Sequence, residues 1–210
     1  MTWRKRLFDL ALAAILGLVL APVLAVLLLA LLLTSGRPLF YASERMHSPD
    51  RPFRLWKLRT MTVSAADSGV SGGDKAHRIT PMGGFLRRSR LDEIPQLWNV
   101  LRGEMSFVGP RPPLRQYVEL RPELYRRVLA ARPGITGLAT LRFHRREERL
   151  LAACRDAAET DRVYVARCIP RKAELDLIYL RRQSVCLDVA ILWETLRRAA
   201  GARPAGRIGR

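Results

Sequence analysis

Cysteine and histidine are both scarce in this chain, and neither falls in a metal-binding pattern. The cysteines are widely spaced and form no CxxC pair: Cys154, Cys168 and Cys186. The histidines, at positions 47, 77 and 144, also lack the spacing of metal ligands. This distribution argues against a structural zinc site and against a disulfide framework. We interpret the cysteines as buried free thiols in a reducing compartment.

Acidic residues are also in short supply. The chain of 210 residues has 19 Asp and Glu against 37 Lys and Arg, a net charge of +18. Such an excess of positive charge indicates an anionic partner, which could be nucleic acid, an anionic lipid surface or a phosphorylated substrate. An apolar stretch near the N-terminus favours the last two, and we expect no nucleic-acid partner. The length allows one modest globular domain plus a membrane element.

The segment from Leu10 to Leu33 contains no charged residue. At ~1.5 Å per residue, a straight helix of this length would cross a bilayer core of ~30 Å. Basic residues 4–6 precede the segment, and the chain after Arg37 is strongly basic. By the positive-inside rule, both ends of the segment prefer the cytoplasm. A simple span would leave one of them outside.

Pro22 lies at the middle of this segment. Proline removes a helix hydrogen bond and clashes with the preceding turn, so a kink here can return the chain to the leaflet it entered. We therefore predict a re-entrant membrane helix-break-helix over residues 1–36, with a true span as the alternative. A cleaved signal peptide is disfavoured because the run is too long. A cytosolic domain over residues 37–200 and a disordered basic tail over 201–210 are expected to follow.

Residues 39–59 have the pattern of a β-hairpin. Two runs with strand-like composition, 39–41 and 53–59, flank a turn through residues 47–52 that contains two prolines. We interpret the second run as alternating apolar and basic residues, which predicts one buried face and one cationic face. Lys57 is expected on the cationic face.

The stretch from Gly83 to Pro113 contains two adjacent acids, Asp92 and Glu93. They precede a proline and an apolar run with helical spacing that Gly103 closes, so we expect them at a helix N-terminus. On spacing alone, capping the helix dipole is the simplest role for such a pair. Three arginines upstream, at positions 87, 88 and 90, make the same place attractive to phosphate. Acids among arginines favour phosphoryl chemistry over hydride or acyl transfer.

Arg111 lies in a short segment with three prolines, Gly109 to Pro113. The prolines make the turn rigid, so the Arg111 side chain is held rather than sampling solvent. A fixed guanidinium suits a bidentate clamp on a phosphate or a nucleotide.

Several motifs together resemble the bacterial sugar transferases, the monotopic phosphoglycosyl transferases. The longest is LRRSRLDEIPQLWNVL at residues 86–101, followed by GEMSFVGPRP at 103–112. KLRTM at 57–61 and RPGITG at 132–137 extend the resemblance, which covers nearly the whole chain from Arg4 to about Leu196. The resemblance implies an α+β fold, in which a re-entrant membrane helix carries a small, mostly helical cytosolic domain with a short β-hairpin.

The implied activity is transfer of a sugar 1-phosphate from a UDP-sugar to undecaprenyl phosphate, which releases UMP at the cytoplasmic face of the bacterial inner membrane. Asp92 is then the nucleophile and Glu93 a ligand of Mg²⁺. The expected phosphate-binding residues are four cations: Lys57, Arg87, Arg111 and Arg132. Asp176, in a C-terminal Asp-x-x-Tyr, is expected to support the site structurally, as Pro22 supports the membrane element. Anionic membrane lipids are expected as further partners.

The chain departs from the family pattern at two places. Ala21 stands where the family usually has Ser before the membrane proline, which removes a hydroxyl that would bond a freed carbonyl and favours the spanning alternative more than in a typical member. Residues 139–144 replace a run that we expect to contact the sugar and the nucleotide.

Two other functions compete with the transferase. One is a non-catalytic basic protein that binds a membrane surface by charge alone. The other is a lipid-linked diphosphatase, which would use water as the acceptor. Neither explains why the paired acids, the following proline and the GPRP turn occur together.

Overall fold

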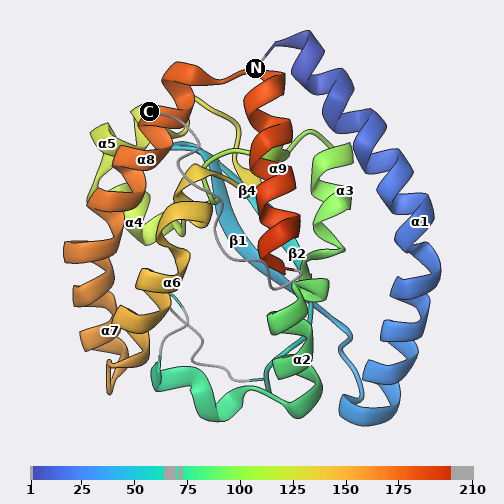
Figure 1. Ribbon diagram of the computed structural model, residues 1–210. Helices are drawn as coiled ribbons and strands as arrows, with labels where there is room; N and C mark the ends of the chain where they lie inside the picture. The colour runs from blue at the N-terminus through green and yellow to red at the C-terminus, as the bar shows by residue number, and fades with distance from the viewer. Residues whose placement is uncertain (1, 64–69, 71–72, 200–210) are drawn as a thin grey trace.

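The computed structural model describes residues 2–63, 70 and 73–199 (Figure 1). The predicted tail, 201–210, lies outside the described residues. The elements follow in this order: α1 (Trp3–Ser35), β1 (Phe40–Ser48), β2 (Arg51–Leu58), η1 (Gly73–Arg78), α2 (Pro81–Ser89), η2 (Leu91–Glu93), α3 (Gln96–Leu101), β3 (Ser106–Val108), α4 (Arg115–Leu120), α5 (Pro122–Val128), β4 (Gly134–Thr136), α6 (Leu138–Ala152), α7 (Ala157–Val163), η3 (Tyr164–Cys168), α8 (Ile169–Arg182) and α9 (Val185–Ala199). The α+β class, with a long apolar N-terminal helix and a small antiparallel hairpin, is confirmed.

Helix α1 is the one helix within the described ranges that is long and apolar enough to cross a membrane. Thr2 caps its start by accepting a hydrogen bond from the Lys5 amide, and Gly36, with a φ of 67°, ends it. The predicted break is not seen in the backbone, because α1 continues as one helix of 33 residues through Pro22.

Both ends of α1 pack on the rest of the protein, while its middle is largely exposed. Its buried residues are confined to 5–13 and 27–31. Figure 1 shows α1 along one side of the domain, beside α3 in its upper part and approaching α2 lower down. The outer surface of α1 is strongly apolar, with Leu18 79% and Leu33 78% exposed.

A buried polar group, which we call the anchor cluster, holds the N-terminal end of α1. The Lys5 Nζ donates to Asp188 Oδ2 at 2.5 Å and to the Val108 carbonyl at 3.1 Å. The Tyr179 hydroxyl donates to Asp188 Oδ1 at 2.6 Å. The anchor cluster therefore joins α1 to β3, α8 and α9 in the interior, and within it the Lys5 ammonium and the Asp188 carboxylate are paired.

The hairpin β1–β2 forms at the predicted place, with a tighter turn than expected because β1 runs on to Ser48. Phe53 and Leu55 are buried. Alternate residues of a strand share a face, so Lys57 lies on the face of Phe53 and Leu55 and not with the exposed Arg54. The prediction that Lys57 belongs to a separate cationic face is wrong, because this run does not alternate strictly.

A second, parallel pair of strands, β3 and β4, crosses the interior with Ser106 opposite Gly134 and Val108 opposite Thr136. The backbones meet closely just beyond β3: a Cβ built on Gly109 would lie 2.1 Å from the Arg132 carbonyl oxygen, and one on Gly134 would lie 2.1 Å from the Gly109 nitrogen. Only glycine allows this approach. The contact fixes the GPRP turn beside the loop that carries β4.

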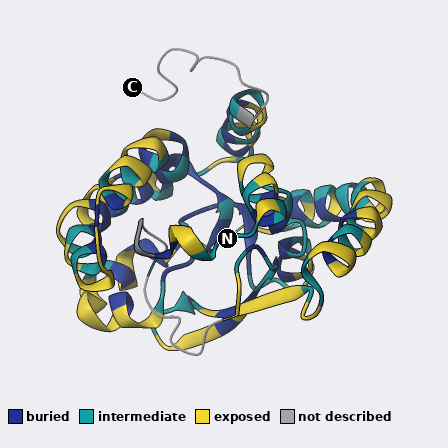
Figure 2. Ribbon diagram, turned by 90° about the horizontal axis from the view of Figure 1, so that it is seen from below, coloured by how far each residue is buried: buried dark blue, intermediate teal, exposed yellow. Residues whose placement is uncertain are grey.

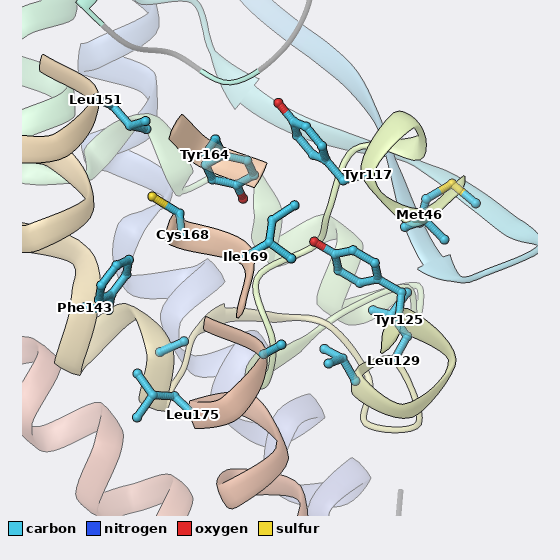
Figure 3. Close-up of a cluster of buried hydrophobic side chains, with 14 residues drawn as sticks. Met46, Tyr117, Tyr125, Leu129, Phe143, Leu151, Tyr164, Cys168, Ile169 and Leu175 are labelled. Carbon is cyan, nitrogen blue, oxygen red and sulfur yellow. The ribbon is translucent and has the colours of Figure 1, made fainter. Parts of the chain in front are cut away.

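The hydrophobic core is divided into clusters. One lies between helices α4–α8 and the hairpin, and its larger members include Met46, Tyr117, Phe143 and Tyr164 (Figure 3). A second cluster lies around β2, β3 and the N-terminal half of α1. A third joins the C-terminal half of α1 to α2 through Leu31, Leu58 and Leu86. Figure 2 shows buried residues where the elements meet and exposed residues on the outer faces of the helices.

Candidate active site

The adjacent acids Asp92 and Glu93, here called the acid pair, lie in the connection between α2 and α3. Arg90 ends α2 in a left-handed conformation, with a φ of 57°, and the short 3₁₀ turn η2 then carries both acids. Helix α3 begins only at Gln96. The acid pair therefore lies in a turn of its own before α3. The helix begins slightly later in the chain than predicted.

Asn99 fixes α3 against the hairpin and so brings Lys57 to the acid pair. Its buried amide donates to the Arg54 carbonyl at 2.7 Å and accepts from the Trp56 amide at 3.2 Å. Lys57 follows directly in β2. These bonds couple the two elements at the point where the site forms.

Glu93 is held by three cations. Its Oε1 lies 3.1 Å from the Lys57 Nζ and also accepts a short hydrogen bond from the Arg111 Nη2. Its Oε2 lies 3.8 Å from the Arg90 Nη1. Burial alone would raise the pKa of Glu93, but Arg111 and Lys57 outweigh it and hold the pKa well below its usual range. Glu93 is therefore ionised and immobilised.

Asp92 lies beside Glu93 but is much less constrained. Its Oδ2 is 3.7 Å from the Lys57 Nζ, and its carboxylate accepts no hydrogen bond from any residue that the structure describes. Burial raises the pKa of Asp92, and the attraction of Lys57 only partly opposes this. The carboxylate combines low solvation with few partners, as a nucleophilic oxygen requires.

Arg111 is fixed from two sides. Its Nη1 donates to the Ile135 carbonyl at 3.1 Å, while its Nη2 reaches Glu93. Its side chain is still 32% exposed. The prediction of a rigidly held guanidinium agrees with this geometry, and the exposed part leaves room for an anionic ligand.

Arg87 reaches the neighbourhood of the acid pair from α2. Its Nε donates to the Thr60 Oγ1 at 2.9 Å, and its Nη2 lies 2.8 Å from the Met61 Sδ. Its charge is among those that lower the pKa of Asp92. Arg87 therefore links the segment that follows β2 to the nucleophile candidate.

Arg132 and Asp176 are not brought to the acid pair. The charges that act on Arg132 are those of Arg6, Asp9 and Arg51, and burial lowers its pKa. Asp176 is buried in α8, where burial raises its pKa to about 7 and Lys172 opposes this. The predicted phosphate contact of Arg132 is therefore not part of the geometry around Asp92.

Two basic residues near the site were not predicted from the sequence. Arg45 faces Phe53 across the hairpin, and burial, followed by the nearby charge of Arg111, lowers its pKa. Burial also lowers the pKa of His144 in α6, with further contributions from Arg90 and Arg111. The register of the hairpin and the packing of α6 create these contacts, and the local sequence carries no signal of either.

The acid pair supplies oxygens that suit Mg²⁺. No group of three or more His, Cys, Asp or Glu side chains in the described part of the chain is placed to hold a metal ion alone. Mg²⁺ at phosphate sites commonly takes one or two carboxylates, and substrate phosphates and water complete its shell. Among the described residues, the partner of Glu93 Oε2 is Arg90 alone, whose Nη1 lies 3.8 Å away. The residues therefore fit Mg²⁺ bound together with a diphosphate.

Comparison with known proteins gives one family. The model of the bacterial sugar transferase family matches residues 1–201. The chain is 34% identical over 200 residues to the UDP-glucose:undecaprenyl-phosphate glucose-1-phosphate transferase of Klebsiella pneumoniae, covering 91% of this chain and 39% of that protein. The chain thus spans about two fifths of the length of this relative.

Two shorter relatives are covered more completely. An uncharacterized sugar transferase, EpsL, of Bacillus subtilis is 36% identical over 195 residues, which is 92% of this chain and 86% of that protein. A Caulobacter vibrioides protein, also named UDP-glucose:undecaprenyl-phosphate glucose-1-phosphate transferase, is 37% identical over 197 residues, or 92% of this chain and 68% of its own length.

Proposed function

Because the chain belongs to the bacterial sugar transferase family, we propose that it transfers a sugar 1-phosphate from a UDP-sugar to undecaprenyl phosphate and releases UMP. The names of the Klebsiella and Caulobacter relatives support this reaction class. The observation that carries the proposal is the contrast within the acid pair. Glu93 is bound by Lys57 and Arg111, whereas the Asp92 carboxylate accepts no hydrogen bond from the described residues.

In the first step, an Asp92 carboxylate oxygen attacks the β-phosphorus of the UDP-sugar. A bond forms between this oxygen and phosphorus, and the bond from phosphorus to the bridging oxygen breaks. UMP leaves with the bridging oxygen and its electron pair. The product on the protein is an aspartyl phosphosugar.

In the second step, a phosphate oxygen of undecaprenyl phosphate attacks the same phosphorus. The bond to Asp92 breaks, and the carboxylate is restored together with a polyprenyl diphosphosugar. No other co-reactant is needed, because each bond formed is matched by one broken.

Cations beside Asp92 neutralise the charge that opposes both attacks. Lys57 and the exposed part of Arg111 are placed to meet non-bridging oxygens, and Arg87 adds positive charge from α2. Glu93 orients Lys57 and Arg111 and would hold Mg²⁺ with the diphosphate. Such an ion, when bound, supplies further charge neutralisation on the leaving phosphate.

The proposal includes a re-entrant membrane element at the cytoplasmic face. Lys5 and Arg6 at one end of α1, and Leu27 and Leu31 near the other, contact the same domain. A domain on one side of a bilayer can hold both ends only if α1 does not cross. A net charge of +18 suits an anionic lipid surface.

The decisive experiment incubates the protein with a donor alone and measures UMP and the intact mass. A panel that includes UDP-glucose should yield, for at least one sugar, a single equivalent of UMP and a phosphosugar adduct on Asp92. Continued UMP release without acceptor would indicate a diphosphatase. Neither UMP nor adduct with any donor would refute the transferase and leave a membrane-binding protein.

A further inference from the structure

A hollow of about 600 Å³ lies at the C-terminal end of α1, between that helix, α2 and the chain that leaves the hairpin. Its lining includes residues from three segments: Thr34 and Ser35 of α1, Met61 and Val63 after β2, and Pro81 and Met82 of α2. Its lining is mostly apolar, and none of the residues assigned to the chemistry above is among those that line it.

The outer rim of the hollow continues the apolar surface of α1. Leu32 is 41% exposed and Leu33 is 78% exposed on the last turns of that helix, and Val63, in the hollow itself, is 73% exposed. Exposed apolar residues that adjoin a membrane helix favour contact with hydrocarbon. A hydrophobic chain that lies along α1 could therefore reach the hollow past Thr34 and Ser35, the two α1 residues that line it.

The inner wall of the hollow leads to the acid pair. Met61 forms part of this wall, and its Sδ lies 2.8 Å from the Arg87 Nη2. The Arg87 charge in turn acts on Asp92. Met61 thus separates an apolar space from a cation whose charge acts on the nucleophile candidate.

The wall is held in place by backbone contacts. The Thr62 amide donates to the Arg78 carbonyl at 2.9 Å, and the Thr80 amide donates to the Thr60 carbonyl at 3.1 Å. A Cβ on Gly83 would lie 2.0 Å from the Thr60 carbonyl oxygen, so α2 packs directly on this segment. The space is therefore preformed rather than dependent on a ligand to open it.

Arg59 closes the hollow at the end of α1 and does not serve as a phosphate ligand. Its guanidinium donates to the carbonyl oxygens of Ser35, Gly36 and Arg37. Arg87 is then the cation that joins the hollow to the reacting centre. An amphiphile with an apolar chain in the hollow would place an anionic head at Arg87.

We propose that this hollow binds the isoprene units nearest the phosphate of a polyprenyl phosphate acceptor, with the phosphate directed past Met61 toward Arg87. This inference rests on the proposed transferase function and specifies the path by which the lipid substrate reaches Asp92. It assigns a binding role to Val63 and Met82, which have no part in the chemistry.

Two substitutions test the hollow without touching the acid pair or its cations. Val63→Glu places a charge in the apolar space, and Thr62→Trp fills part of it, since both side chains are exposed. Leu120→Glu is the matched control, because Leu120 is 54% exposed on α4. We expect the KM for undecaprenyl phosphate to rise about tenfold or more in both hollow variants, comparable to losing the burial of two methylene groups.

The first half-reaction separates this proposal from the function on which it rests. Donor alone should give the same UMP burst and Asp92 adduct in the wild type, both hollow variants and the control. A water-soluble alkyl phosphate without an isoprenoid chain should discharge the adduct equally in all four. An unchanged KM for undecaprenyl phosphate in the hollow variants would overturn the proposal that the hollow binds the acceptor. The proposed transferase function would still stand.

Direct labelling tests the hollow without turnover. A polyprenyl phosphate with a photoreactive group on its first isoprene unit should label the peptide that carries Met82 in wild-type protein in vesicles. Labelling should fall at least severalfold in Thr62→Trp and persist in Leu120→Glu. Label found only on the middle of α1 would refute the assignment, whether or not the donor forms an adduct.

Discussion

The anchor cluster and the acid pair are both buried groups of opposite charges, yet their bonding differs. In the anchor cluster, Lys5, Tyr179 and Asp188 share short hydrogen bonds, and both Asp188 oxygens are used. In the acid pair, the cations gather on Glu93, and the Asp92 carboxylate has a single ion pair among the described residues, at 3.7 Å. Full pairing gives a rigid joint, whereas uneven pairing leaves one carboxylate able to react.

The largest expected effect comes from Asp92→Asn. The substitution keeps size and burial but removes the nucleophilic carboxylate, so UMP release should fall by about 10⁴-fold. The thermal unfolding midpoint should stay near that of the wild type, because Asp92 contributes little bonding. Asp50→Asn, in the exposed hairpin turn, is the control and should retain full activity. Substantial turnover by the Asp92 variant would remove the basis for the contrast between the two clusters.

Asp188→Asn should mainly lower the stability of the fold, whereas Asp92→Asn mainly lowers activity. Removing one partner leaves the buried Lys5 ammonium without its counter-charge, which costs about 3–5 kcal/mol of unfolding free energy. Chemical denaturation in detergent measures this loss. The double variant Lys5→Met with Asp188→Leu should recover much of it, since it leaves no unpaired charge. If the single variant is as stable as the wild type, the anchor cluster does not hold α1.

Asp176 is a buried carboxyl outside both clusters, and it tests how burial without close pairing affects stability. Its Oδ1 is buried and has no hydrogen-bond partner among the described residues. Burial raises its pKa to about 7 in the folded protein, against ~3.9 when unfolded. The folded state therefore binds this proton more tightly, and stability decreases as pH rises between these two values.

Asp176→Asn should remove that pH-dependent loss. We expect the variant to gain about 1–3 kcal/mol of unfolding free energy relative to wild type on going from pH 4 to pH 8. Denaturation at the two pH values measures the difference. Parallel pH curves for the Asp176 variant and the wild type would contradict the assignment.

The smallest effect is expected from Arg111→Lys. A lysine keeps the charge but not the fork that reaches both Glu93 and the Ile135 carbonyl, so donor-dependent turnover should fall by about tenfold. The loss should fall mainly on kcat/KM for the UDP-sugar. Arg121→Lys, at an exposed position between α4 and α5, should change nothing. Equal activity of the Arg111 and Arg121 variants would show that Arg111 is only a point charge.

The sequence allowed the hairpin, the turn that carries Arg111 and the acid pair to be predicted, because each has a strong local signal in proline, glycine or charge. It also allowed Lys57 to be named as a site residue, but only through the family resemblance. Its face in β2 was predicted wrongly because the run of residues 53–59 does not alternate, and only pairing with β1 settles it.

Other features depend on contacts between distant segments. The Arg111 charge acts on Arg45 because the hairpin packs against the segment after the GPRP turn, where the Met46 amide donates to the Pro113 carbonyl, and no local pattern in β1 predicts this proximity. The three-residue strands β3 and β4 are too short to show a period. Arg132 matched the family motif, yet its loop turns toward Arg6 and Asp9. Pro22 predicted a break, but the flanking apolar residues continue the helix around it.

The close approach at Gly109 and Gly134 has a consequence for genetics. A methyl group at either position would wedge the two backbones apart and carry Arg111, two residues beyond Gly109, away from Glu93. A random screen for inactive alleles should therefore recover substitutions at these glycines alongside those at Asp92. Such alleles would have the phenotype of a damaged catalyst, although the altered atom takes no part in the reaction.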